Sequence, residues 1–200
     1  MQTNNKQNKD IPFIASALEV IESFVIAVAC VICIFVFVAR LSVVSGDSMN
    51  NTLEENDYIL VVNFFNTYDP DNGDIVVIHG NYQYYNTPIV KRVIATEGQT
   101  IKIDRSKRLV YVDDVLLDEE YAFYKLGGAF IIPETPGGHY DYTTGIFTAT
   151  VPEGHIFVMG DNRLESADSR VKEIGFVNVD NVLGKAVLRV APFSKIGSLN

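Results

Sequence analysis

Cysteine and histidine are scarce in this chain, and their positions exclude two kinds of site. Both cysteines lie in one apolar segment near the N-terminus, where we expect them to be small packing residues. The 160 residues after position 40 contain no cysteine, so that part of the chain must fold without disulfides. The histidines are scattered and show no spacing typical of metal ligands. The sequence therefore predicts no metal site and no cofactor. The residues concerned are Cys30, Cys33, His79, His139 and His155.

Clustered positive charge is also missing. After position 40, 13 Lys and Arg residues stand against 22 Asp and Glu residues, which accounts for the whole net charge of −9. A protein that binds nucleic acid needs Lys and Arg side chains gathered against the phosphates. We therefore expect no nucleic-acid partner, and we interpret the acidic balance as an ordinary soluble surface.

One apolar segment is long enough to cross a membrane. The 17 residues of Ser23–Ala39 carry no charge, at the short end of the roughly 17–25 residues that a spanning helix needs. A cleaved signal peptide is the alternative, but it would have a shorter apolar region and small residues in an Ala-x-Ala spacing. Phe37 occupies the outer of those two positions. We therefore predict a retained anchor.

The flanking charges predict the orientation of this anchor. Lys6 and Lys9 precede it, whereas only Arg40 follows closely. Because Lys and Arg near the ends of a span favour the cytoplasmic side, the N-terminus is expected in the cytoplasm. The protein would then be single-pass in the cell membrane, with its larger part on the extracytoplasmic side. The predicted divisions are a cytoplasmic segment 1–19, a transmembrane anchor 20–41 and an extracytoplasmic catalytic domain 42–200.

The remainder of the chain has the pattern of a mainly β protein. Short apolar runs alternate with turn residues, and no long amphipathic helical pattern follows Val44. Residues 113–150 hold most of the Pro and Gly, which indicates an irregular β excursion or a small subdomain. We predict a mainly β sheet or barrel on a single helical tether. The expected strands are Tyr58–Val62, Ile75–Ile78, Ile89–Ala95, Thr100–Ile103, Leu109–Val112, His155–Met159 and Val182–Val190.

Ser48 and Lys91 are candidates for nucleophilic chemistry. A serine becomes a strong nucleophile when a base takes its proton, and a lysine can be that base if burial lowers its pKa to ~7–8. Strand alternation puts Lys91 and Arg92 on opposite faces among apolar neighbours, and does not decide which is buried. Arginine stays protonated and cannot be a base. Taken singly, each candidate has an ordinary interpretation: Ser48 as a turn residue, Lys91 as a surface residue of an edge strand.

A charge-dense loop, Gly160–Arg170, lies between two apolar strands. It carries Asp, Asn, two Arg and two Ser in eleven residues. Such a loop can support a functional site. It can equally be a solvated turn with one Asp168–Arg170 pair, which contributes little stability when exposed.

Three motifs, in this order after the anchor, resemble the bacterial type I signal peptidases, also called leader peptidases, in the compact form of Gram-positive bacteria. The first is Ser48-Met49 followed by Thr52-Leu53, and the second is Lys91-Arg92-Val93. The third is Gly160-Asp161-Asn162-Arg163 with Ser166-x-Asp168-Ser169-Arg170. The resemblance runs from the anchor to about Val190. Asn51 stands where the family usually has proline, which loosens a turn but removes no catalytic group.

The resemblance implies a serine endopeptidase with a Ser/Lys dyad and a role for each matching residue. Ser48 would be the nucleophile, with its backbone N–H as an oxyanion donor, and Lys91 the general base. Ser166 would hydrogen-bond the lysine, and Asp168 with Arg170 would brace the site. Gly46 stands where some members place a serine hydroxyl, so that donor is missing here. The other matching residues, expected to support the site, are Met49, Asp161 and Asn162.

The implied activity is removal of signal peptides from exported preproteins, after small residues in an Ala-x-Ala pattern. Ser48 is nine residues past Ala39, which places it within roughly 30 Å of the end of the anchor. The lipid bilayer is thus an expected partner. Two apolar runs, Phe64–Phe65 and Phe130–Ile132, are either lipid contacts or, more ordinarily, core residues.

Two alternatives remain from the sequence. A Ser/Lys self-cleaving protease of the repressor type shares the β fold, but the anchor and the acidic charge argue against it. A non-catalytic, anchored extracytoplasmic binding module would need none of the dyad chemistry, and an activity measurement separates it from both enzymes.

Overall fold

The structure is a computed structural model that describes residues 7–63, 68–80, 87–124 and 130–199. The chain divides into two units, residues 1–39 and residues 40–200, which are described separately.

The first unit is a single helix, α1 (Gln7–Phe37). It contains Ser16–Cys33, a stretch long and apolar enough to cross a membrane, and no other described helix meets that test. The helix ends before residue 41, where the sequence placed the end of the anchor. Arg40 and Ser42 alternate with Leu41 and Val43, the period of a strand, and these residues form β1 (Ala39–Val43). The division into cytoplasmic, spanning and outer segments stays a prediction.

The second unit is built of β-strands, as the sequence predicted. Its larger sheet has the order β1-β2-β12-β3-β4-β10-β11, and β13 pairs with β12. The pairings with a described register are antiparallel. The strands are β2 (Tyr58–Val62), β3 (Ile75–Ile78), β4 (Ile89–Ala95), β10 (His155–Met159), β11 (Val177–Asn178), β12 (Val182–Ala191) and β13 (Gly197–Ser198); the short helices η1 (Val179–Asn181) and η2 (Phe193–Lys195) lie between them.

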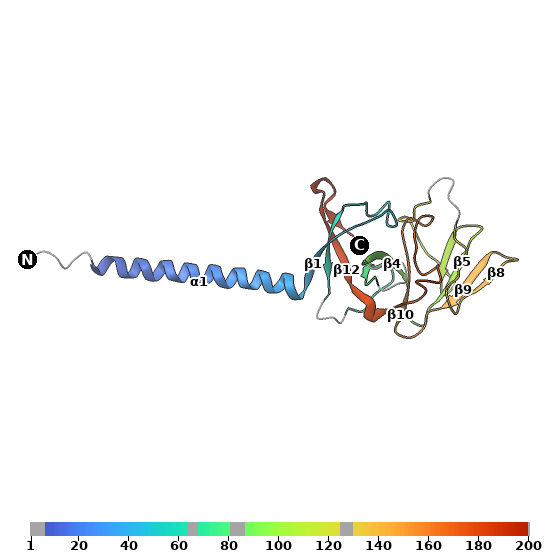
Figure 1. Ribbon diagram of the computed structural model, residues 1–200, viewed down its shortest axis with the longest axis horizontal. Helices are drawn as coiled ribbons and strands as arrows, with labels where there is room; N and C mark the ends of the chain where they lie inside the picture. Colours follow the sequence, from blue (N-terminus) through green and yellow to red (C-terminus); the bar gives the residue numbers. More distant parts are fainter. Residues whose placement is uncertain (1–6, 64–67, 81–86, 125–129, 200) are drawn as a thin grey trace, which may run out of the picture. The chain divides into compact units, whose positions relative to one another are not determined.

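A second sheet of five strands has the order β7-β6-β5-β9-β8 and is also antiparallel. Figure 1 shows β5, β9 and β8 together, apart from β12. Within the excursion at residues 113–150, β9 pairs with β5, so the excursion completes this sheet instead of forming a separate subdomain. The strands are β5 (Thr100–Asp104), β6 (Leu109–Val112), β7 (Val115–Leu116), β8 (His139–Asp141) and β9 (Ile146–Thr150).

Apolar side chains from both sheets share a core. Ile101 and Ile103 of β5 and Phe147 of β9 pack in one buried cluster with Phe157 and Met159 of β10. Burial of this much apolar surface is the main favourable term that joins the sheets. All seven strands predicted from the sequence are present, because each combines β-branched or aromatic residues with flanking turn residues.

Candidate active site

Buried apolar side chains anchor the loop that carries Ser48 in the core of the larger sheet. Met49 and Leu53 are buried, at 1% and 0% exposure, in a cluster with Ile59 of β2. The Leu53 amide donates to the Met49 carbonyl at 2.8 Å, which closes a turn directly after Ser48. Gly46 has φ +83°, a left-handed conformation that favours glycine. The sequence around Ser48 therefore folds into a fixed turn.

Lys91 lies in the interior of the larger sheet. It belongs to β4, between β3 and β10, and pairs in register with Val76 of β3. Its side chain is only 3% exposed. The interpretation of Lys91 as a surface residue of an edge strand is wrong, because β4 has a partner strand on both sides.

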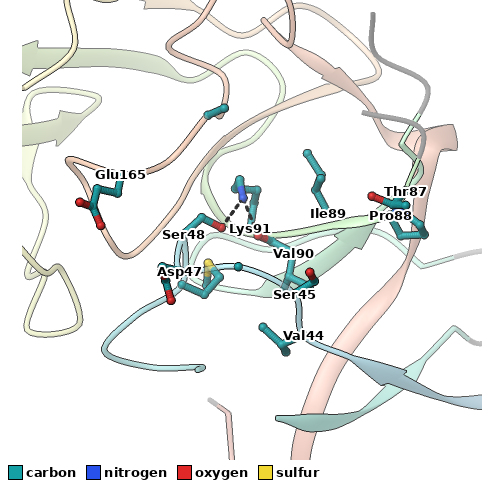
Figure 2. Close-up of a pocket in the computed structure, with 13 residues that line it drawn as sticks. Val44, Ser45, Asp47, Ser48, Thr87, Pro88, Ile89, Val90, Lys91 and Glu165 are labelled. Atoms are coloured by element: carbon teal, nitrogen blue, oxygen red, sulfur yellow. Dashed lines mark hydrogen bonds between the residues drawn. The ribbon is translucent and has the colours of Figure 1, made fainter. Parts of the chain in front are cut away.

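The two residues of the expected dyad are in contact. Lys91 Nζ donates to Ser48 Oγ at 2.7 Å and to the Val90 carbonyl at 2.9 Å. Figure 2 shows the two side chains pointing toward each other. Burial lowers the pKa of the Lys91 ammonium from 10.5 to about 8, and the nearby charge of Arg170 acts in the same direction. Asp168 and Asp161 oppose that shift. Near pH 8, a large fraction of the amine is thus neutral and can accept a proton.

Arg92, the second cation of this strand, is buried as well, at 6% exposure. Its Nε and Nη2 atoms donate to the two oxygens of Asp161 at 2.8 and 2.7 Å. Asp161 also accepts from the Thr52 hydroxyl at 2.6 Å. A bidentate, charge-assisted pair thus compensates the buried guanidinium and reaches the loop that follows Ser48.

The loop Gly160–Arg170 is folded into the protein. Asp168 and Arg170 have fully buried side chains, and the Nε and Nη2 atoms of Arg170 each donate to the Asp168 carboxylate at 2.8 Å. The Gly160 amide donates to the same carboxylate at 3.0 Å. Burial opposes the charge of Asp168, but Arg170 and these hydrogen bonds hold the pKa of its carboxyl below the ordinary value. The interpretation as a solvated turn is wrong.

This loop also holds the backbone of Ser48. The Asn162 amide donates to the Ser48 carbonyl at 3.0 Å, and Asn162 Nδ2 donates to the Asp47 carbonyl at 3.1 Å. A Cβ on Gly160 would lie 2.4 Å from the Ser48 carbonyl oxygen and 2.2 Å from Ser166 Oγ. Glycine is therefore required at position 160 for the two loops to approach this closely.

Ser166 lies within the same buried region, at 2% exposure. Its hydroxyl is close to the Asp168 carboxylate, yet it has no partner with hydrogen-bond geometry among the described residues. The hydrogen bond expected between Ser166 and Lys91 is not formed. Lys91 instead makes its second described bond to the carbonyl of the preceding residue, Val90.

A pocket of about 330 Å³ opens on Ser48 and Lys91. In Figure 2, Thr87, Pro88 and Ile89 lie on one side of the dyad and Glu165 on the other. The apolar part of the lining comes from the start of β4 with the preceding Pro88, from the residues around Ser48, and from Ala167 of the Gly160–Arg170 loop. The lining residues are Val44, Ser45, Gly46, Asp47, Ser48, Met49, Thr87, Pro88, Ile89, Val90, Lys91, Glu165 and Ala167.

Within the described ranges, no group of three or more His, Cys, Asp or Glu residues could hold a metal ion. The two apolar runs that the sequence offers as lipid contacts or core residues differ in what the structure describes. Phe130 is a core residue at 5% exposure, whereas Ile132 is 37% exposed. Phe64 and Phe65 lie outside the described residues.

Sequence reasoning missed the segment 119–123, which follows β7 of the second sheet and contacts the site. Both Glu119 oxygens accept from Arg163, at 2.9 and 2.5 Å, and the guanidinium carbon of Arg92 lies 4.0 Å from the centre of the Tyr121 ring. No motif marks this segment. Its one signal is an acidic and aromatic run within a region rich in turns.

Comparison with known proteins identifies the family of this chain. The profile of the family described as signal peptidase, peptidase S26 matches residues 17–191. A probable signal peptidase I-1 of Synechocystis sp. is 36% identical over 170 residues, which cover 82% of this chain and 76% of that protein. Signal peptidase IB of Staphylococcus aureus is 33% identical over 184 residues, which cover 85% of this chain and 88% of that protein.

Among solved structures, a signal peptidase I from Enterococcus faecalis V583 matches with a TM-score of 0.43 and 27% identity, over 59% of this chain and 97% of that one. The family profile and the relatives favour a peptidase over a non-catalytic module and over a self-cleaving repressor-type protease. The chain belongs to the signal peptidase family S26, membrane-associated serine endopeptidases that remove signal peptides by a Ser/Lys dyad mechanism.

Proposed function

We propose that Ser48 is the nucleophile and Lys91 the general base of this signal peptidase. The observation that carries the proposal is the 2.7 Å contact between Lys91 Nζ and Ser48 Oγ, made by a lysine with 3% exposure. A neutral amine at that distance can take the hydroxyl proton as the oxygen attacks.

Acylation would proceed at the Ser48 oxygen. Lys91 Nζ takes the proton while Ser48 Oγ forms a bond to the scissile carbonyl carbon, and the carbonyl π electrons move to its oxygen. The Ser48 backbone N–H is the proposed donor to that oxyanion. The Lys91 ammonium then gives its proton to the departing amide nitrogen as the carbon–nitrogen bond breaks. The products are the freed N-terminus of the mature protein and an ester on Ser48.

Deacylation would use the same base. Neutral Lys91 takes a proton from water as the water oxygen attacks the ester carbon, and then returns it to Ser48 Oγ as the ester bond breaks. The carboxyl end of the signal peptide leaves, and both residues regain their starting protonation.

The supporting residues are proposed to hold these two groups in place. Asn162 fixes the turn of Ser48 because its amide donates to the Ser48 carbonyl. Asp161 fixes the same turn by accepting from the Thr52 hydroxyl. Asp168 and Arg170 form the buried pair beside Lys91, where their charges act in opposite directions on its pKa. The remaining proposed supports are Met49, which is buried beneath the turn, Gly46 in the pocket wall, and Ser166, whose buried hydroxyl lies close to the Asp168 carboxylate.

The proposed substrate is the cleavage region of a preprotein. The pocket of about 330 Å³ is partly walled by Val44, Pro88 and Ile89, which suits small apolar residues of the Ala-x-Ala kind. Glu165, on the other side of the dyad in Figure 2, would then face the residues after the cleaved bond.

We further propose a single-pass orientation with residues 42–200 on the extracytoplasmic side of the bilayer. The apolar stretch Ser16–Cys33 and the preceding Lys6 and Lys9 support it. Phe193, 87% exposed, is an apolar group that suits contact with lipid. The acidic balance of residues 41–200 gives no support to a nucleic-acid partner.

Cleavage of an Ala-x-Ala peptide by the full chain in detergent tests the chemistry. Ser48→Ala is expected to abolish cleavage with an unchanged circular dichroism spectrum. Ser194→Ala, an exposed serine of η2 outside this pocket, is the matched control and should keep activity within about threefold. Cleavage by Ser48→Ala at near the wild-type rate would contradict the proposal.

Protease accessibility tests the orientation. In intact spheroplasts, protease added outside should digest residues 42–200 and leave the N-terminal segment protected. Protection of residues 42–200, with digestion only after the membrane is opened, would overturn the proposed orientation.

A further inference from the structure

The segment 119–123 lies against residues 160–163 of the Gly160–Arg170 loop. The Phe123 amide donates to the Asp161 carbonyl at 2.7 Å, and the Arg163 amide donates to the Phe123 carbonyl at 3.0 Å. These bonds flank Asn162, whose own amide holds the Ser48 carbonyl. The loop of residues 160–163 is thus hydrogen-bonded to the turn of Ser48 and, through Phe123, to a segment that continues from the second sheet.

Side chains of the same segment meet two of the buried arginines around the site, Arg163 and Arg92. The two Glu119 oxygens accept from Nη1 and Nη2 of Arg163, a residue with no exposed surface, whose Nε donates to the Gly160 carbonyl at 3.1 Å. The Tyr121 ring centre lies 4.0 Å from the guanidinium carbon of Arg92 and 5.7 Å from that of Arg163. At 4.0 Å, a guanidinium is well within the range at which an aromatic ring attracts it.

Arg92 transmits this contact toward the nucleophile. Its Nε and Nη2 atoms donate to Asp161 at 2.8 and 2.7 Å, and its Nη1 donates to the Gly73 carbonyl at 2.8 Å. These bonds hold the edge of the guanidinium, whereas the Tyr121 ring covers its face. Asp161 in turn accepts from Thr52 at 2.6 Å, four residues after Ser48 and inside the turn that Met49 and Leu53 anchor. Three contiguous contacts therefore lead from Tyr121, in the segment that follows the second sheet, to the turn after Ser48.

We propose that Tyr121 is a positioning residue for the catalytic serine, acting through Arg92, Asp161 and Thr52. This inference rests on the proposed role of Ser48. The ring limits where the Arg92 guanidinium can lie, so that Asp161 keeps the orientation in which it accepts from Thr52. Without the ring, Arg92 can tilt into the vacated space, Asp161 follows, and the turn that presents Ser48 Oγ to Lys91 loosens. The phenol hydroxyl is not needed, because its described bond, to Glu119, is long at 3.4 Å.

The test compares three variants of the full chain on one Ala-x-Ala peptide. Tyr121→Leu should lower kcat by about tenfold with KM within twofold, because a shift of well under 1 Å at a reacting group is costly. Tyr121→Phe keeps the ring and should stay within twofold of wild type. Tyr111→Leu is the matched control: its ring lies 5.3 Å from Lys102 within the five-stranded sheet, and kcat should not change.

A double-mutant cycle separates positioning from a general loss of stability. Thr52→Val removes the hydroxyl at the far end of the pathway, and Thr52→Ser keeps it. If Tyr121 acts through Thr52, the effects of Tyr121→Leu and Thr52→Val on kcat should be clearly less than multiplicative. Multiplicative effects would overturn the inference, as would a Tyr121→Leu enzyme whose kcat equals that of Tyr111→Leu.

Two further comparisons cover the case in which Tyr121→Leu does not stay folded and separate the role of Tyr121 from that of Ser48. If Tyr121→Leu melts below the assay temperature, Thr52→Val and Thr52→Ser decide: a tenfold lower kcat for Val alone supports the pathway, and equal activity overturns it. Wild type and Ser48→Ala are assayed alongside. Cleavage by Ser48→Ala would refute the proposed nucleophile. If Ser48→Ala is inactive and Tyr121→Leu keeps the wild-type kcat, only the role of Tyr121 is refuted.

Discussion

Lys91 Nζ lies 2.7 Å from Ser48 Oγ, although 43 residues separate the two in the chain. Each is held by a different part of the fold. Lys91 is fixed by the strands on both sides of β4, whereas Ser48 depends on hydrogen bonds from the loop that begins at Gly160. The contact therefore places a buried amine against a hydroxyl that opens on a pocket, the arrangement that a lysine general base needs.

The buried lysine should cost the protein stability. A pKa lowered from 10.5 to about 8 corresponds to on the order of 3 kcal/mol at pH values below 8, where both the folded and unfolded states hold the proton. As the pH rises from about 8 to 10.5, the unfolded state keeps a proton that the folded state has lost, so folding becomes more favourable. Lys91→Met should thus raise the free energy of unfolding by about 1–3 kcal/mol at pH 7, with no activity. Urea unfolding in detergent measures this, and a less stable Lys91→Met at pH 7 would contradict it.

The Asp168–Arg170 pair should be costly to break. Both side chains have no exposed surface, so Asp168→Asn leaves a buried guanidinium without its counter-charge. We expect a loss of about 3–5 kcal/mol in the free energy of unfolding. Glu54→Gln is the control, because the Lys195–Glu54 pair is 41% and 57% exposed and should change stability by less than about 1 kcal/mol. If both variants lose the same free energy of unfolding, burial does not make the Asp168–Arg170 pair more costly to break than an exposed pair.

Position 160 should not tolerate a side chain. The Cβ of Gly160→Ala would meet the Ser48 carbonyl oxygen at 2.4 Å, so the backbone of the nucleophile must move. We expect kcat to fall by about 10²-fold. Gly197→Ala, where nothing lies within 4 Å of the new Cβ, should be neutral. Steady-state kinetics on one peptide compares the two, and a fully active Gly160→Ala enzyme would show that the loops can separate without cost.

Local patterns in the sequence predict the strands of this fold well. Runs such as Ile75–Ile78 and Ile89–Ala95 carry their own β preference and lie between turn residues. The end of the helix was harder to place, because Leu41 and Val43 are as apolar as the residues of α1 and only their alternation marks a strand.

The burial of charged residues could not be predicted from local patterns. Strand alternation leaves Lys91 and Arg92 equivalent, and both are buried because β4 has neighbours on each side and the Gly160 loop supplies Asp161. Glu119 and Tyr121 are separated from their partners by more than 25 positions. Contacts over such distances depend on how the sheets pack, which no short motif encodes.

The pH dependence of kcat/KM for an Ala-x-Ala peptide tests the central claim most directly. If neutral Lys91 is the base, kcat/KM should fall about tenfold for each pH unit below the pKa of the amine, and level off above about 8. Lys91→Arg should show no cleavage at any pH, because arginine cannot release its proton. A kcat/KM that stays constant from pH 6 to 10 in the wild type, or an active Lys91→Arg enzyme, would contradict the assignment of Lys91 as the general base.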